Sequence, residues 1–140
     1  MIGTPERVSA TDTPVAPWLI QGEATVIQVM LVSTAVDTAN TGQTHILRSG
    51  LCLGQMTAGA SIRKYVDYLD GEADGRGTGK AILVHSVNMK DSQGTARDTI
   101  ALVAIGGDCL VEVDNLYAYD ANFGTDLEAS FKFSTSYEPA

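Results

Sequence analysis

The stretch from Asp70 to Lys80 joins two apolar segments and constrains both the fold and the function of this chain. It reads DGEADGRGTGK and runs directly into the apolar segment Ala81–Val84. A phosphate-binding loop needs a glycine five residues before the glycine of its Gly-Lys pair, then a hydroxyl residue and a helix. Here those two positions hold Asp74 and Ala81. We therefore interpret the stretch as a surface loop between strands, whose glycines permit positive φ angles.

The composition favours β structure. The chain has 140 residues, of which 14 are glycine and only 19% are charged, a low fraction for a helical bundle. Threonine, serine and valine are plentiful and suit strands and turns. We expect a mainly β, single-domain module of the β-sandwich or barrel type with little helix, spanning residues 18–140. Residues 1–17, which include three prolines and show no hydrophobic period, are predicted to form a flexible, extended N-terminal arm.

Several segments have the hydrophobic pattern of strands. Glu23–Val36 is apolar on both faces, which indicates burial within the domain or at a subunit contact. Ala81–Asn88 is predicted to be a further strand. Thr99–Ile105 and Cys109–Val113 are predicted to pair as a hairpin around the two glycines between them.

Two other segments differ in how clearly they signal their structure. Alternation of apolar and polar residues is cleanest from Leu127 to Tyr137, and it predicts a strand that buries Phe131 and Phe133 on one face. Ser61–Leu69 fits the spacing of a helix, but it is short and rich in β-branched and aromatic residues. Local patterns leave that segment undecided between helix and strand.

The charge balance argues against nucleic acid as a direct partner. The net charge is −8 and the isoelectric point is near 4.5, whereas binding to phosphates needs clustered Lys and Arg. The longest apolar run, Ala24–Val36, is too short and too polar to cross a bilayer. We expect neither direct nucleic-acid binding nor membrane insertion. The lack of a secretory signal favours a reduced, intracellular origin.

The cysteines and histidines are the residues best able to carry chemistry. Cys52 and Cys109 lie within apolar runs, which favours buried, inert thiols, although a disulfide is possible if their strands are adjacent. His45 and His85 have no partners at metal-ligand spacing. A pair of a cysteine with a histidine is formally possible, but apolar surroundings raise a thiol pKa. We expect a non-enzymatic protein with no catalytic, cofactor-binding or metal-binding residues.

Four carboxylates near the glycine-rich loop could in principle bind calcium. The spacing of an EF-hand loop is absent, because Gly71 follows Asp70 directly and no carboxylate closes the loop at its last position. A solvated acidic loop is the favoured interpretation for the four residues, which are Asp67, Asp70, Glu72 and Asp74.

Two alternative interpretations involve the segment around Tyr117. Val113–Tyr117 faintly resembles the aspartate-and-tyrosine segment of trimeric deoxyuridine triphosphatases, which are small β-barrel nucleotide hydrolases. Their glycine-rich C-terminal arm and phosphate-binding arginine are missing, because the tail is Ser134–Ala140. Alternatively, Tyr117, Tyr119 and Phe123 could form a glycan site on a tail, fibre or surface β-module that binds protein or glycan.

The central half of the chain carries an ordered series of short motifs. Ile46–Thr57 reads ILRSGLCLGQMT and is followed by the basic and aromatic segment Arg63–Val66, an Asp-Gly loop and the segment Gly79–Val84. Two later apolar segments lie within Thr99–Val111. From about Ile46 to Asp114, this series resembles the head decoration proteins of tailed bacteriophages. None of the motifs is a catalytic signature.

The resemblance implies a mainly β module in which Ser61–Leu69 is extended. It also implies a homotrimer that binds the major capsid protein on the exterior of the virion capsid, at the quasi-threefold sites of an expanded icosahedral head assembled in the host cytoplasm. In that family the N-terminal arm orders on the coat protein. Pro14, Val15, Pro17 and Trp18 are therefore the expected capsid contacts, and no cofactor is implied.

Overall fold

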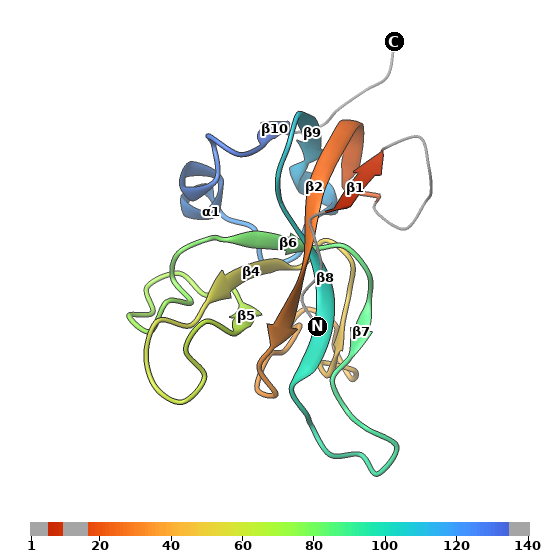
Figure 1. Cartoon of the computed structure of the whole chain (residues 1–140), viewed down its shortest axis with the longest axis vertical. Helices are drawn as coiled ribbons and strands as arrows, with labels where there is room; N and C mark the ends of the chain where they lie inside the picture. Colours follow the sequence, from red (N-terminus) through yellow and green to blue (C-terminus); the bar gives the residue numbers. More distant parts are fainter. Residues whose placement is uncertain (1–5, 10–16, 135–140) are drawn as a thin grey trace.

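The chain is mainly β, as its composition predicts (Figure 1). The computed structural model describes residues 6–9 and 17–134. It contains one α-helix, α1 (Ala121–Asp126), and one 3-10 turn, η1 (Val113–Asn115). The strands are β1 (Glu6–Ser9), β2 (Leu19–Leu31), β3 (Ile46–Leu47), β4 (Cys52–Gln55), β5 (Tyr65–Asp67), β6 (Ala81–Leu83), β7 (Val87–Asn88), β8 (Thr99–Gly106), β9 (Cys109–Glu112) and β10 (Lys132–Ser134).

Five strands close into a small barrel, so the barrel-like form of the predicted fold is confirmed. Strand β2 pairs with β8, β8 with β6, β6 with β4 and β4 with β5, all antiparallel. Strand β5 then returns to β2 through a short parallel contact between Leu31 and Tyr65. The Val32 N–H donates to the Tyr65 carbonyl at 2.9 Å beside this contact. Strands β3 and β7 form a separate two-stranded sheet.

Strands β8 and β9 continue one another along β2, so the predicted hairpin between them is wrong. Strand β8 pairs with the Thr25–Leu31 part of β2, and β9 pairs with the Leu19–Gly22 part, both antiparallel. The chain bends between them at Gly106 and Gly107, whose φ angles are 154° and 128°. A Cβ at Gly107 would lie 2.6 Å from the Glu23 carbonyl oxygen. The glycines thus bend one strand in the manner of a bulge instead of reversing it.

The barrel wall is buried on both faces at β4 and β6. Neighbouring residues of a strand point to opposite faces, and in β4 and β6 both sets are apolar. Leu53, Ala81 and Leu83 belong to a core with contributions from all five barrel strands, which places it inside the barrel. Cys52 and Ile82 belong to a second core outside it. Double burial explains why these segments read as continuous apolar runs.

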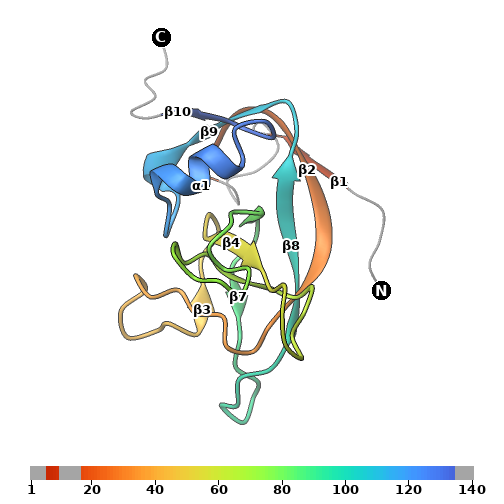
Figure 2. The same ribbon diagram turned by 90° about the vertical axis from the view of Figure 1, so that its left-hand side faces the viewer.

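A second layer of the protein covers the outer core. Figures 1 and 2 show α1 and β10 above β4 and β6. This layer, strand β9 and the residue before β2 supply large buried side chains, whose exposures range from 0% to 6%: Trp18, Val111, Phe123, Leu127 and Phe131. The outer face of the barrel is therefore a packing surface over this region.

Other predicted strands are present with altered bounds. Glu23–Val36 corresponds to β2, which begins earlier, at Leu19, and ends at Leu31. Ala81–Asn88 contains two strands, β6 and β7, which belong to different sheets. Ser61–Leu69 contains strand β5 after a turn, which agrees with the extended form implied by the resemblance.

The alternating segment Leu127–Tyr137 is not one strand, and this prediction is wrong. Leu127 caps α1, and the Phe131 N–H donates to the Leu127 carbonyl at 2.9 Å, so these two buried side chains are separated by a turn. Only Lys132–Ser134 is a strand, parallel to β9. Phe131 is buried and its ring centroid lies 5.8 Å from that of the half-buried Phe133. Residues 135–140 lie outside the described part of the chain.

The N-terminal residues contain a strand where the sequence predicted an irregular arm. Strand β1 pairs antiparallel with β2, with Glu6 opposite Val26 and Ser9 opposite Glu23. Pairing of strands uses backbone groups, so it does not require the hydrophobic period that this segment lacks.

Double burial predicts equal sensitivity at adjacent positions of β6. The substitutions Ile82→Ala and Leu83→Ala should each lower the free energy of unfolding by about 2–5 kcal/mol, because each leaves a cavity in a different core. The half-exposed Ile100 serves as the control, and Ile100→Ala should cost less than about 1 kcal/mol. Urea denaturation measures all three. A loss at Ile82 no greater than at Ile100 would show that the outer face is not a core.

Candidate functional site

The glycine-rich loop is fixed against the barrel. The Thr57 N–H donates to the Asp74 carbonyl at 2.8 Å. The Arg76 Nη2 lies 2.8 Å from Asp67 Oδ2, and Asp67 also accepts from the Val36 N–H at 3.0 Å. Asp67 is buried, with a side-chain exposure of 8%. The prediction of a solvated acidic cluster is therefore wrong for Asp67, which is the anchor of the loop.

Two glycines allow the loop and α1 to approach the barrel closely. A Cβ at Gly54 of β4 would lie 2.9 Å from the Arg76 carbonyl oxygen, and a Cβ at Gly79 would lie 2.5 Å from the Phe123 ring. The Gly79 N–H donates to Asp126 Oδ2 at 2.8 Å. A phosphate-binding loop presents its N–H groups to a ligand, whereas this N–H is bonded within the fold. The geometry agrees with a structural loop.

A cleft of about 340 Å³ lies between this loop and the start of α1. Three carboxylates line it, from Asp67, Asp70 and Asp120. Asp70 accepts from Asn122 Nδ2 at 2.9 Å, and Asp120 accepts from the Tyr68 hydroxyl at 2.8 Å. Burial, together with this bond to Asp120, raises the pKa of Tyr68. Each carboxylate accepts a hydrogen bond within the fold, which is the pattern of structural groups. The sequence did not signal this cleft, because its residues come from distant parts of the chain.

The three aromatic residues expected at a glycan site lie in different environments. Phe123 is fully buried, so its proposed exposure is wrong. Tyr117 is half-buried beneath Arg48, whose guanidinium carbon lies 3.7 Å from the ring centroid. Tyr119 is half-buried and packs edge-on against Phe123, with a centroid distance of 5.9 Å. Arg48 is in turn held by the buried Asp37 at 2.8 Å.

The two cysteines are buried and form no disulfide, as the apolar-run interpretation predicts. Burial raises the pKa of Cys109 to about 11 and also raises that of Cys52. Thiols with raised pKa values are protonated near neutral pH and react slowly. His45 is half-buried and His85 is exposed. Among residues 6–9 and 17–134, no group of three or more His, Cys, Asp or Glu is placed to hold a metal ion.

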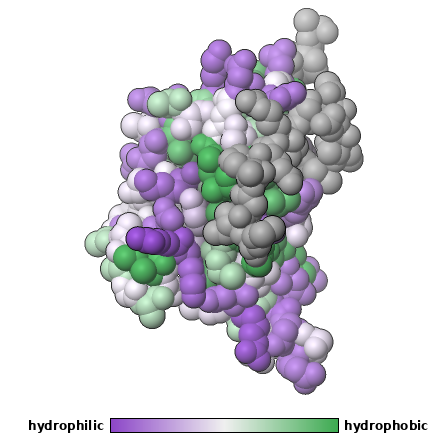
Figure 3. Space-filling model, in the orientation of Figure 1, coloured by the Kyte–Doolittle hydropathy of each residue, from purple (hydrophilic) through white to green (hydrophobic). Residues whose placement is uncertain are grey.

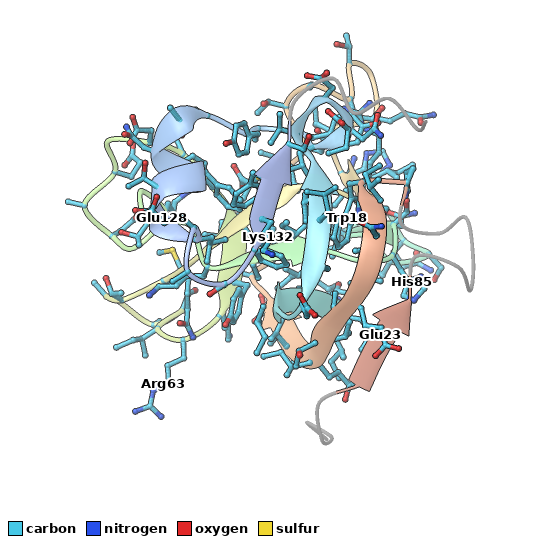
Figure 4. All side chains as sticks on the ribbon, turned by 90° about the horizontal axis from the view of Figure 1, so that it is seen from above. Trp18, Glu23, Arg63, His85, Glu128 and Lys132 are labelled. Carbon is cyan, nitrogen blue, oxygen red and sulfur yellow. The ribbon has the colours of Figure 1, made fainter. Side chains whose placement is uncertain are left out.

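Of the residues expected to contact a capsid, Trp18 does not lie on the surface. Trp18 has no exposed surface, belongs to the outer core and donates its ring N–H to Ser49 Oγ at 3.1 Å. Figure 4 shows it inside the fold, beside β2. It is therefore an anchor and not a surface contact, which corrects the prediction. Pro17 is exposed, whereas Pro14 and Val15 lie outside the described residues.

The segment that faintly resembles nucleotide hydrolases is a short turn. Val113–Asn115 forms η1, and Asn115 Nδ2 donates to the Pro17 carbonyl at 3.0 Å. Tyr117 forms an isolated parallel bridge with Leu51. The segment thus connects the arm and the barrel in this protein.

Comparison of the chain with protein-family models, with curated proteins and with solved structures finds no match. In the described part of the chain, no helix has the length and apolar character needed to cross a membrane.

Removal of the Arg76 side chain should destabilise the fold, because it leaves the buried Asp67 carboxylate unpaired. We expect Arg76→Ala to lower the free energy of unfolding by about 3 kcal/mol. The control is Arg97→Ala, which breaks an ion pair with Asp91 in which the Arg97 side chain is 68% exposed; this change should cost less than about 1 kcal/mol. Equal losses in chemical denaturation would contradict a structural role for the Asp67–Arg76 pair.

The raised pKa values predict unreactive thiols. At pH 8, which lies below the pKa of about 11 at Cys109, iodoacetamide should modify neither cysteine in the folded protein. Both cysteines should react once urea unfolds the chain. Mass spectrometry of the labelled protein measures this. Rapid labelling of either thiol before unfolding would refute the assignment of both as inert core residues.

Proposed function

We propose that this protein decorates the head of a tailed bacteriophage. In this proposal it is a non-enzymatic homotrimer that binds the major capsid protein at threefold or quasi-threefold sites on the outside of the expanded shell. The proposal starts from the resemblance of Ile46–Asp114 to that group of proteins. It implies no cofactor, no direct contact with nucleic acid and no membrane.

One observation supports the proposal most strongly: the residues on which the resemblance rests have structural roles in the fold. They include β3 to β9, among which are four of the five barrel strands, and the glycine-rich loop that Arg76 anchors. The side chains of these residues pack the fold and anchor the loop, so we assign the function to the outer surface of the protein. A cement protein needs such a rigid body and a binding surface, and it needs no catalytic group.

Binding to the assembled shell accounts for stabilisation without chemistry. A protein that binds only the assembled state shifts the equilibrium toward that state by mass action. Three copies around one axis combine weak contacts into a shared avidity. A net charge of −8 also favours solubility at high copy number.

The arm is the part of the chain that we assign to the coat protein. Trp18 is fixed in the outer core and Pro17 is exposed beside it, so the preceding residues start from a rigid point on the surface. Pro14, Val15 and Pro17 remain the proposed contacts, without Trp18. Extended, proline-containing segments bind with little loss of conformational freedom.

A groove near the C-terminal layer favours a second function, glycan or protein binding by a phage tail, fibre or surface module. The groove is open, measures about 490 Å³ and is lined by Tyr119 and Phe133 together with Glu128 and Lys132. Aromatic rings beside charged groups suit sugar rings and their hydroxyls. Binding on a glycan array that is lost in Tyr119→Ala would favour this function. No group of described residues favours the remaining alternative, which is a nucleotide hydrolase.

The capsid proposal is tested with purified protein and expanded phage shells. We expect co-sedimentation with shells and added density at threefold sites in cryo-microscopy. The triple substitution Pro14→Ser, Val15→Ser and Pro17→Ser should reduce binding about tenfold or more, since about 1.4 kcal/mol of lost contact has that effect, while the melting temperature stays unchanged.

The matched control lies in the hydrophilic loop between β7 and β8, which protrudes from the molecule (Figure 3). Ser92→Ala with Gln93→Ala in this exposed loop should leave shell binding unchanged. Failure of the unmodified protein to bind any shell would refute the proposed function. Equal binding by the arm variant would refute only the role of the arm.

A further inference from the structure

The barrel closes at a short seam between β2 and β5. Strand β8 pairs with β2 from Thr25 to Leu31, whereas β5 meets β2 at one register pair, Leu31 with Tyr65. The ends of β2 and β5 lie side by side in Figure 1. The Val32 N–H donates to the Tyr65 carbonyl at 2.9 Å just past this pair. This is the shortest of the barrel pairings among the described residues, so we expect the barrel to open here first.

An aspartate reinforces the seam where β5 begins. Asp98 directly precedes β8, and Lys64 directly precedes β5. Asp98 Oδ1 accepts from the Ser33 N–H at 2.8 Å, just past the end of β2. Asp98 Oδ2 accepts from Lys64 Nζ at 2.6 Å. One carboxylate therefore connects three neighbouring barrel strands, which are β8, β2 and β5.

A second aspartate makes the same kind of connection where β5 ends. Asp67 Oδ1 accepts from the Val36 N–H at 3.0 Å, and Asp67 Oδ2 accepts from Arg76 Nη2 at 2.8 Å. Each aspartate thus bonds one backbone N–H of the segment after β2 and one cationic side chain. Charge-assisted bonds of this kind are stronger than neutral ones. They hold β2 and β5 together beyond the short stretch where the two strands pair.

The two ends of the seam differ in their exposure to solvent. The Asp67 and Arg76 side chains are 8% and 25% exposed, whereas those of Asp98 and Lys64 are 35% and 34% exposed. Solvent and salt weaken an exposed ion pair more than a buried one. The Asp98 end of the seam is therefore the easier end to release.

We propose that Asp98 is a latch whose charge holds the seam shut, and that loss of this charge lets the start of β5 swing away from the end of β2. Asp67 acts as the hinge, because its bonds to Val36 and Arg76 stay in place. The pairings of β2 with β8 and of β4 with β6 also persist. The latch works within one chain and does not depend on a capsid.

Release of the latch opens a route into the core inside the barrel. Leu31 and Val66 belong to this core, with exposures of 0% and 1%, and Tyr65 packs against it. Opening exposes these apolar side chains to water, which costs free energy. The open form is therefore a minor state while Asp98 is charged. The seam acts as a gate on the barrel interior.

Acid is the trigger for this latch. The hydrogen bond from Lys64, together with the Ser33 N–H, lowers the pKa of Asp98 from its usual value, and Lys64 is the charged group that acts on it among the described residues. Arg97, the neighbour of Asp98 in the chain, pairs instead with Asp91 at 2.9 Å. A lowered pKa in the folded state adds stability above about pH 4, and this stability is lost as the pH falls through that pKa. The seam is therefore closed near neutral pH and opens in acid.

Hydrogen exchange of the full chain at neutral pH tests the latch. Asp98→Asn keeps the size of the side chain and one acceptor oxygen but removes the charge. It should speed exchange at the Val32 and Ser33 amides about fivefold or more. The Leu83 amide, which donates to the Leu51 carbonyl between β6 and β4, should exchange at an unchanged rate. Unchanged exchange at Val32 and Ser33 would overturn the proposal, as would equal acceleration at Leu83, because the whole barrel would then open.

Two further variants separate the ion pair from a general effect of lost charge. Asp91→Asn is the matched control, since Asp91 also binds an arginine and backbone N–H groups, and it should leave exchange at Val32 unchanged. Lys64→Gln should reproduce the effect of Asp98→Asn, and the double variant should add little to either change alone. Additive effects, or an equal effect of Asp91→Asn, would contradict a latch made by the Asp98–Lys64 pair.

A pH profile tests the trigger. After correction for the intrinsic pH dependence of exchange, protection of Val32 and Ser33 should fall between about pH 5 and about pH 3 in the unmodified protein. Val36 at the hinge and Leu83 in the barrel should stay protected over this range. Asp98→Asn should show no such step, because it has no carboxylate at that position to protonate. A step of equal size in Asp98→Asn, or simultaneous loss of protection at Leu83, would overturn the proposal.

Discussion

Burial of the barrel wall on both faces is the constraint on which the rest of the structure depends. Strands β2, β4, β6 and β8 each contribute apolar residues to the core inside the barrel and to the core outside it. The inner face is buried because the barrel closes on itself. The outer face requires a separate cover, and Trp18 with the layer from β9 to β10 supplies it. Gly79 then has to be a glycine, because the Phe123 ring of that cover lies against it.

Residues whose role is set by their neighbours in the chain were predictable, and the others were not. The run Ala81–Val84 reads as a buried strand because burial on both faces removes the need for polar residues. The bend at Gly106 and Gly107 was misread, because a glycine pair between two apolar segments signals a hairpin in isolation. Whether the chain reverses or continues depends on β2, which is far away in the sequence. The alternation of apolar and polar residues after Leu127 predicts a strand wrongly for a similar reason, since a turn can also place alternate residues in one core.

The candidate site shows the same division. Burial of both thiols followed from the apolar residues beside them, and a structural role for the glycine-rich loop followed from the missing phosphate-binding spacing. The partner of Asp67 was not predictable, because Arg76 belongs to a loop whose path is set by contacts with β4. The anchoring of Trp18 depends on Ser49, which is 31 residues away. Local sequence marked Trp18 as an apolar end of the arm and could not show that it lies in the core.

The anchoring of Trp18 changes how the N-terminal arm can act. Two described parts of the N-terminal region are fixed in the fold: β1 pairs with β2, and Trp18 lies in the outer core. A segment fixed at both ends has fewer conformations than a free tail of the same length, so a partner that orders it loses less entropy on binding. In the proposed contact with a coat protein, the affinity would therefore depend on the stability of the β1–β2 pairing as well as on the contacts of Pro14, Val15 and Pro17.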